Sequence, residues 1–237
     1  MRAVSVLELK EVSKRYRSRQ REQLVLAQIS LQIDAGELVV IYGARRSGRT
    51  TLLRIAAGLE RPDSGSVTFQ GRDLEHERDR ILGEGIAYVH RALNASEEEG
   101  VLEQIAAPLL ARGIPIEQAR SAARAALARA GGEERTAALI AELNAGETTQ
   151  VKLARALVLS PALVVFDEPV AAVALSERDH ILARLRTLAG EGTAVLASAS
   201  EPGELAGATR ALTLADGQLR GATTPQLAPV VALRRSS

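Results

Sequence analysis

A glycine-rich loop, which reads GARRSGRTT over residues 43–51, constrains this chain more than any other segment. The apolar run Leu38–Tyr42 before it has the length of a strand buried on both faces, and Thr50–Ala57 shows a helical pattern. In such a unit, glycines let backbone N–H groups face a phosphate, and the helix N-terminus adds its positive dipole. The pattern G-x-x-x-x-G-K-[ST] is met except at Arg49, which replaces Lys. Taken alone, the segment is either a phosphate-binding loop or a chance glycine-rich turn.

Two adjacent carboxylates, Asp167 and Glu168, follow a second apolar run, Leu163–Phe166. In nucleotide hydrolases that use such a pair, the first carboxylate holds Mg²⁺ and the second polarises the attacking water. We therefore expect Asp167 and Thr50 as metal ligands and Glu168 as the catalytic residue. By itself the segment is read more simply as a strand followed by an acidic turn, but its place downstream of the glycine-rich loop favours a nucleotide site.

Strand and helix patterns are distributed unevenly along the chain. Strands are expected over 4–9, 24–33, 38–42, 66–70 and 86–89, and again over 162–166, 194–197 and 210–214. Helical patterns fill the middle, over 101–110, 115–130, 136–143 and 147–159, and another amphipathic helix is expected over 176–188. This order predicts an α/β sheet with an all-helical insertion over about 91–160. Residues 223–237, with two prolines and a polar end, are expected to form a weakly ordered tail.

The composition excludes several classes of site. The chain has no Cys, which removes disulfides, thiolate metal sites and cysteine nucleophiles. A net charge of +1 gives no electrostatic footprint for nucleic acid, and an aromatic content of 2% leaves few rings for base stacking. We see no signal peptide and no uncharged apolar run of membrane-spanning length. The absence of Cys fits the cytosol, although secreted proteins can lack Cys too, and we expect no nucleic-acid partner.

A further motif lies between the loop and the carboxylate pair. Leu143–Glu147 reads LNAGE and Gln150–Leu157 reads QVKLARAL. These segments resemble the nucleotide-binding subunits of ABC transporters, whose signature reads L-S-G-G-[QE] followed by Q-R-V-x-[IL]-A-R-A-L. The likeness covers Leu7 to about Gly221 and looks closest to the lipoprotein-release and macrolide-export branch. It implies one ATP-binding domain over 1–222, with a P-loop NTPase (RecA-like) core, an N-terminal antiparallel β subdomain and an inserted α-helical subdomain.

The resemblance also implies a ligand and partners. In the family, ATP with Mg²⁺ lies between one subunit's loop and the signature of a second subunit, in a homodimer or a heterodimer. The dimer serves an integral membrane permease on the cytoplasmic face of the cell membrane. Tyr16 falls where the family stacks an aromatic ring on adenine. Carried over by motif, the expected nucleotide contacts are Tyr16, Gly43, Ala44, Arg45, Arg46, Ser47, Gly48, Arg49, Thr50, Thr51, Arg91, Asn144, Ala145, Gly146, Glu147 and Ser200.

The sequence departs from the family pattern where nucleotide chemistry is concentrated. Arg49 replaces the loop lysine, Arg91 replaces the glutamine that ligates Mg²⁺, and Ser200 replaces the histidine that touches the γ-phosphate. Ala174 replaces the aspartate that closes the loop after Pro169. The signature Ser-Gly pair is Asn144-Ala145, and alanine is unfavourable if the backbone there needs a positive φ.

Three functions remain compatible with these motifs. The chain is an energy-coupling ABC subunit with weak ATP hydrolysis, a non-catalytic regulatory subunit, or a soluble P-loop enzyme such as a small-molecule kinase. The signature-like run and the helical insertion disfavour the last. Since losing one charge-stabilising donor typically costs ~2.7–4 kcal/mol of barrier, we expect slow hydrolysis. A cation at Arg91 would repel Mg²⁺, so we also expect nucleotide affinity to depend weakly on that ion.

Overall fold

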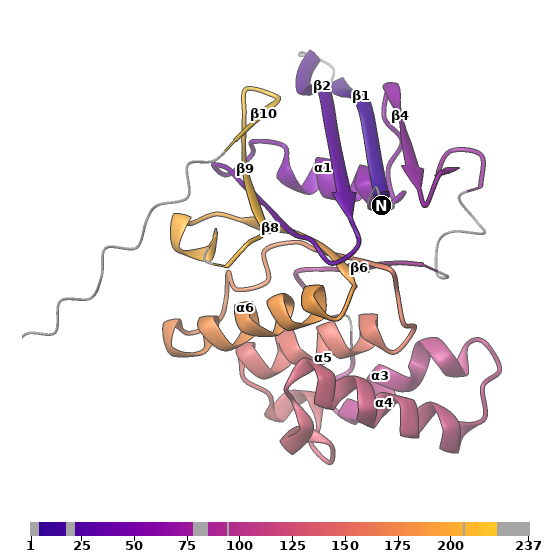
Figure 1. The fold of residues 1–237 in the computed structure, drawn as a ribbon. Coiled ribbons are helices and arrows are strands. Elements are labelled where there is room, and N and C mark those ends of the chain that lie inside the picture. The colour runs from indigo at the N-terminus through magenta and orange to yellow at the C-terminus, as the bar shows by residue number, and fades with distance from the viewer. Residues whose placement is uncertain (1–4, 18–21, 78–84, 94, 206, 222–237) are drawn as a thin grey trace, which may run out of the picture.

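The computed structural model describes residues 5–17, 22–77, 85–93, 95–205 and 207–221 (Figure 1). The strands are β1 (Ser5–Arg17), β2 (Glu22–Asp34), β3 (Leu38–Tyr42), β4 (Ser64–Phe69), β5 (Arg72–Asp73), β6 (Ile86–Val89), β7 (Leu163–Phe166), β8 (Ala194–Ala199), β9 (Arg210–Ala215) and β10 (Gln218–Gly221). The α-helices are α1 (Arg49–Ala56), α3 (Val101–Leu110), α4 (Ile116–Ala130), α5 (Ala145–Leu157) and α6 (Leu175–Gly190). Short 3-10 helices cover Glu133–Arg135, Ile140–Glu142 and Pro202–Leu205.

A six-stranded sheet forms the centre of the described structure, in the order β10-β9-β3-β8-β7-β6. The strands from β9 to β6 are parallel, and β10 returns antiparallel to β9 through the turn at Asp216-Gly217. All four residues of β7 are fully buried, as the continuous apolar run predicts for a strand covered on both faces. The parallel arrangement brings the carboxyl ends of β3, β6, β7 and β8 to one edge of the sheet.

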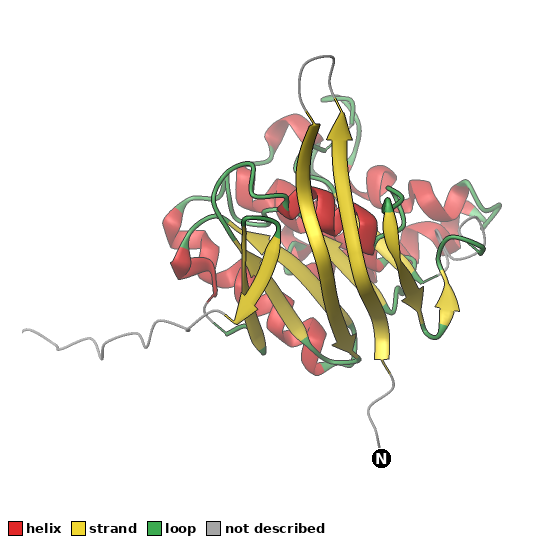
Figure 2. Ribbon diagram, turned by 90° about the horizontal axis from the view of Figure 1, so that it is seen from above, coloured by secondary structure: helices red, strands yellow, loops and turns green. Residues whose placement is uncertain are grey.

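A second sheet, in the order β2-β1-β4-β5, is antiparallel throughout. Its strands β1 and β2 pass in front of α1 when the molecule is viewed from above (Figure 2). Their inward side chains, such as Leu9 and Ile33, join one apolar cluster with Leu53 of α1 and Val39 of β3. Helix α1 therefore lies between the two sheets, and its position is fixed by burial on both sides.

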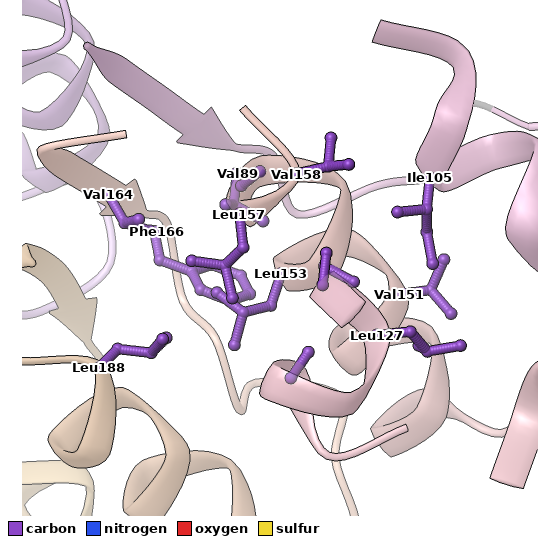
Figure 3. Packing of buried hydrophobic residues seen from close by; sticks show 14 of the residues in the cluster. Val89, Ile105, Leu127, Val151, Leu153, Leu157, Val158, Val164, Phe166 and Leu188 are labelled. Atoms are coloured by element: carbon purple, nitrogen blue, oxygen red, sulfur yellow. The ribbon is translucent and has the colours of Figure 1, made fainter. Parts of the chain in front are cut away.

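The opposite face of the central sheet is covered by helices α3 to α6 (Figure 1). Figure 3 shows Phe166 and Val164 of β7 packed beside Leu153 and Leu157 of α5, in the cluster that also includes Leu188 of α6. Alternate residues of β7 thus serve two cores. Leu163 and Val165 face α1, while Val164 and Phe166 face the helices.

The predicted fold class is confirmed, with an antiparallel sheet near the N-terminus and α3, α4 and α5 inserted between β6 and β7. The helix predicted over 136–143 is wrong, because this segment forms a turn and the short 3-10 helix Ile140–Glu142. Leu139 there makes an isolated bridge with Gly100, and Val101 N donates to Ala138 O at 3.0 Å. These backbone hydrogen bonds to a distant segment replace the bonds that the expected helix would have formed.

The tail expected over 223–237 lies outside the described residues. Among the helices that the structure does describe, none combines the length and the apolar character needed to cross a membrane.

Candidate nucleotide-binding site

Four segments with predicted site residues meet at the carboxyl edge of the central sheet. The loop after β3 leads into α1, Arg91 follows β6, Glu168 follows β7 and Ser200 follows β8. In open α/β sheets, ligands bind outside the carboxyl ends of the strands, where neighbouring loops diverge. The topology therefore gathers residues from distant parts of the sequence at one edge.

The glycines of the loop are required by space and by backbone conformation. A Cβ on Gly43 would lie 2.6 Å from Ser47 Oγ and 2.7 Å from Leu214 O, so a side chain there has no room. Gly48 has φ +102, in the left-handed region. Arg46 also has a positive φ of 65, which is uncommon for a residue with a side chain and lies in the loop expected to bind phosphate.

The N-terminus of α1 is open to a ligand. Gly48 is the N-cap residue and provides no side-chain cap for the first helical N–H groups, which lack intrahelical acceptors. Ser47 Oγ, beside this N-terminus, is buried without a hydrogen-bond partner among the described atoms. Backbone donors at a helix N-terminus, a hydroxyl without a partner and the positive end of the helix dipole suit a phosphate group.

An open pocket of about 420 Å³ lies over this helix N-terminus. It is lined by Tyr16, Gln23, Val25, Arg45, Arg46, Ser47, Gly48, Arg49, Thr50, Thr51, Arg91 and Glu168. The lining of this pocket therefore includes four arginines and a single carboxylate. Gly43 and Ala44 line a neighbouring pocket, together with Arg45, Arg46 and Ser47.

The side chain of Arg49 is directed into the protein. Its Nη2 lies 2.8 Å from Glu168 Oε1, its Nη1 donates to Ala199 O, and the side chain is 6% exposed. On the other oxygen of Glu168, Oε2, Arg91 Nη1 lies 3.2 Å away, from a side chain that is 63% exposed. Glu168 is thus held between two guanidinium groups, one buried and one in solvent.

Asp167 is buried, and its two oxygens are already engaged. Thr50 Oγ1 donates to Asp167 Oδ2 at 2.9 Å, and Ser198 Oγ donates to Asp167 Oδ1 at 2.7 Å. Ser198 Oγ also accepts the backbone N–H of Glu168 at 2.8 Å. A magnesium ion requires a near-octahedral set of oxygen ligands. With both carboxylates engaged and Arg91 paired with Glu168, this set does not fit a divalent ion.

Tyr16 closes one side of the pocket. Its hydroxyl lies 2.6 Å from Glu60 Oε1 and 3.2 Å from Thr51 Oγ1, while the side chain is 43% exposed. Partial burial, followed by the hydrogen bond to Glu60, raises the pKa of Tyr16 above its ordinary value. These bonds fix the tyrosine at its edge and leave the ring accessible, so the structure is compatible with the adenine-stacking role expected for it.

The signature-like residues lie elsewhere, at the N-terminus of α5, and do not line this pocket. Asn144 caps the helix: Glu147 N donates to Asn144 Oδ1, and Asn144 N donates to Glu147 Oε2, both at 2.9 Å. Ala145 is the first helical residue and has no positive φ, so the conflict foreseen for alanine does not arise. Glu177 of α6 accepts from Asn144 Nδ2 at 3.2 Å, which brings a carboxylate to this N-terminus.

Two of the positions expected to depart from the family pattern do not line the pocket. Ser200 follows β8 and is absent from the pocket lining, and its backbone N–H donates to the buried carboxylate of Glu204 at 2.8 Å. Ala174 is the N-cap residue of α6 and forms no side-chain cap. Within one chain, the structure therefore unites the loop with Tyr16, Arg91 and Glu168, but not with 144–147 or Ser200.

Several residues of the site gave no signal in the sequence. Ser198 looks like any small residue in a buried strand, yet its hydroxyl supports both carboxylate positions. Burial, followed by the negative charge of Asp167, raises the pKa of Tyr88. Burial, followed by the positive charge of Arg91, lowers the pKa of Lys152, whose Nζ donates to Arg91 O at 2.9 Å.

Many known proteins are similar to this chain in sequence. The chain is 35% identical over 219 residues to the lipoprotein-releasing system ATP-binding protein LolD of Chromohalobacter salexigens, covering 90% of this chain and 92% of the relative. LolD of Maricaulis maris is 37% identical, with 90% and 96% covered. The macrolide export ATP-binding/permease protein MacB 1/2 of Paracoccus denitrificans is 32% identical over 90% of this chain, which spans 33% of that longer protein.

Solved structures of ABC transporter cassettes have a similar fold. The dimeric structure of MJ0796, a bacterial ABC transporter cassette, superposes with a TM-score of 0.81 at 26% identity, covering 90% of this chain and 96% of that one. A dimeric post-hydrolysis state of MJ0796 bound to ADP and Pi gives a TM-score of 0.82 at 25% identity, covering 92% and 98%. The family model described as ABC transporter matches residues 26–171. The resemblance read from the motifs is therefore confirmed, and the chain belongs to the ABC transporter family.

Proposed function

We propose that this chain is the ATP-binding subunit of an ABC transporter, and that it holds nucleotide at a dimer interface while hydrolysing it slowly. The observation that carries the second part is the position of Glu168 between Arg49 and Arg91. A general base must lie within hydrogen-bond reach of the proton that it removes. Here both carboxylate oxygens are already bound to cationic donors, so the side chain is held for structure and not directed at a water molecule.

Nucleotide binding is supported by the arrangement of the loop. The uncapped N-terminus of α1, the unpartnered Ser47 hydroxyl and the arginines of the pocket all suit the phosphates of ATP. One solved relative of the same fold was determined with ADP and Pi. The accessible ring of Tyr16 at the pocket edge supports a base-stacking role.

The partners follow from the relatives. MacB 1/2 of Paracoccus denitrificans and the pyoverdine export protein PvdT of Pseudomonas aeruginosa are both described as ATP-binding/permease proteins, and this chain spans 33% of each. That proportion supports a separate permease subunit as the partner of this chain, with the chain on the cytoplasmic face of the membrane. Because MJ0796 is dimeric, we also propose a second ATP-binding chain, identical or different, opposite 144–147.

A steady-state ATPase assay tests the proposed function. We expect slow turnover by the natural chain, and faster turnover, by about tenfold or more, in the triple variant Arg49→Lys, Arg91→Gln, Ser200→His, which restores the family residues. Effects of groups that act together are not additive, so the single variants are measured as well. Glu168→Gln in the triple variant is the control and should abolish the gain.

Two outcomes decide between the alternatives. Robust turnover by the natural chain that Glu168→Gln abolishes would contradict slow hydrolysis. No turnover above the Glu168→Gln background, with nucleotide binding intact, would favour the alternative function, a non-catalytic subunit that positions or regulates the permease.

A further inference from the structure

We propose that this site takes nucleotide as the metal-free polyphosphate, and that the guanidinium group of Arg91 supplies the countercharge that a divalent ion would otherwise provide. The inference rests on the proposed nucleotide-binding function and specifies the chemical form of its ligand. It follows from the oxygen atoms at the end of β7, which do not form a ligand set suited to magnesium.

The oxygen ligands available to a cation are few and already occupied. Thr50 Oγ1 and Asp167 Oδ2 are bound to each other, and Asp167 Oδ1 accepts from Ser198. Both oxygens of Glu168 pair with arginines. A metal ion entering here would have to displace these bonds while remaining close to the positive charges of Arg49 and Arg91, which Coulomb repulsion opposes.

The two arginines that hold Glu168 differ in their freedom to move. Arg49 is 6% exposed and bridges Glu168 and Ala199 O, so it is fixed between the ends of β7 and β8. Arg91 is 63% exposed and has one described contact to Glu168, an ion pair of 3.2 Å. Because Arg91 lies largely in solvent and Glu168 keeps its bond to Arg49, moving Arg91 to a phosphate has a small cost.

The excess of positive charge in the pocket favours a highly charged anion. Arg45, Arg46, Arg49 and Arg91 line it against the single carboxylate of Glu168. A metal-free triphosphate carries more negative charge than its magnesium complex, and therefore matches an arginine-rich pocket better. Guanidinium groups bind phosphate through paired, charge-assisted hydrogen bonds, which a lysine cannot reproduce. Arg49 keeps Glu168 in place while Arg91 exchanges that carboxylate for phosphate.

Equilibrium binding of ATP, measured by calorimetry in excess EDTA and in excess MgCl₂, tests the proposal on the full chain. We expect the natural protein to bind ATP more tightly in excess EDTA, by about tenfold or more, because excess Mg²⁺ converts the nucleotide into a complex that the pocket matches less well. Arg91→Gln should weaken metal-free binding by about tenfold or more, the loss expected for charged hydrogen bonds, and should weaken binding of the magnesium complex much less. Arg61→Gln, an exposed arginine outside this pocket whose described partner is Glu75 at 3.8 Å, is the matched control and should change neither constant.

A second readout does not depend on affinity. Electron paramagnetic resonance of Mn²⁺ added to the ATP complex should show no protein-bound ion in the natural chain, and a bound ion in Arg91→Gln. The melting temperature of Arg91→Gln should match that of the natural protein, because the side chain is exposed.

The outcomes separate the inference from the function on which it rests. A natural protein that binds ATP as tightly or more tightly in excess MgCl₂ overturns the inference and leaves the nucleotide-binding function intact. An equal loss of both affinities in Arg91→Gln also overturns it, since Arg91 would then be an ordinary phosphate contact. Absence of ATP binding in either buffer overturns the proposed function as well.

Discussion

Arg49 Nη2 and Glu168 Oε1 form an ion pair of 2.8 Å at the carboxyl ends of β3 and β7, with the two side chains only 6% and 12% exposed. The pair connects the first residue of α1 to the end of β7, and the second guanidinium nitrogen of Arg49 extends the link to Ala199 at the end of β8. Three parallel strands are thus tied at one edge by the residue that replaces the family lysine.

The Arg49–Glu168 pair should show strong coupling in a double-mutant cycle. Glu168→Leu leaves the buried Arg49 charge without its counterpart and should lower the free energy of unfolding, by about 3–5 kcal/mol for a fully buried pair. Arg49→Met should cost less, because Arg91 remains paired with Glu168. The double variant should lose less than the sum of the two, because no uncompensated charge remains. Urea unfolding of the four proteins measures this, and additive losses would contradict an energetic link between the residues.

We expect the buried hydroxyl of Ser198 to contribute to the stability of the fold. Its buried hydroxyl donates to Asp167 Oδ1 and accepts the N–H of Glu168, so Ser198→Ala leaves two polar groups without their partner. We expect a loss of about 1–3 kcal/mol in the free energy of unfolding. Ser30→Ala is the control: that hydroxyl also accepts a backbone N–H, from Glu11 at 3.1 Å, but it is exposed, and its removal should cost well under half as much. Equal losses would show that burial does not decide the effect.

The signature-like segment should behave first as a helix cap. Asn144→Ala removes the side-chain acceptor for Glu147 N and should destabilise the protein by about 1 kcal/mol. Asn144→Ser keeps an acceptor at the N-cap and should retain most of the stability. Thermal unfolding of the three proteins provides the measurement. A loss in Asn144→Ser as large as that in Asn144→Ala would contradict the capping role.

Alkaline pH should destabilise the fold partly through Tyr88. Burial and the charge of Asp167 raise the pKa of Tyr88 in the folded state above the value of about 10 in the unfolded chain. The unfolded chain therefore loses this proton first, and stability present below pH 10 is lost as pH rises above it. Tyr88→Phe should flatten this part of the stability profile, measured by denaturant unfolding between pH 8 and pH 11.

Lys152 titrates in the same alkaline range as Tyr88 and changes stability in the opposite direction. Its folded-state pKa is lowered, by burial first and by Arg91 second, so the folded protein releases the lysine proton at a lower pH than the unfolded chain does. Stability therefore rises with pH until the unfolded chain releases its lysine proton too. This opposes the effect of Tyr88, and only the difference between the natural protein and Tyr88→Phe isolates the tyrosine. An unchanged slope in Tyr88→Phe would contradict the assignment.

Elements buried on both sides were predictable from the sequence. The apolar runs that became β3 and β7 have no polar face because they are covered by α1 on one side and by the helical layer on the other. Helix α3 has the predicted bounds, Val101–Leu110, because its apolar periodicity agrees with its packing. The segment 136–143 was not predictable, since its backbone bonds go to Glu99 and Val101, which lie far away in the sequence.

The sequence by itself determined the strand–loop–helix unit, the carboxylate pair and the presence of Arg49 where the motif has lysine, because these depend on local spacing and residue type. The tertiary structure decided where the side chains of those residues go. The guanidinium of Arg49 reaches Glu168 and Ala199 because the parallel strands bring three loop ends within the length of one side chain. Arg91 meets the same carboxylate from β6, at the edge of the sheet. The sequence shows that a lysine is missing; only the fold shows that its replacement binds the protein's own carboxylate.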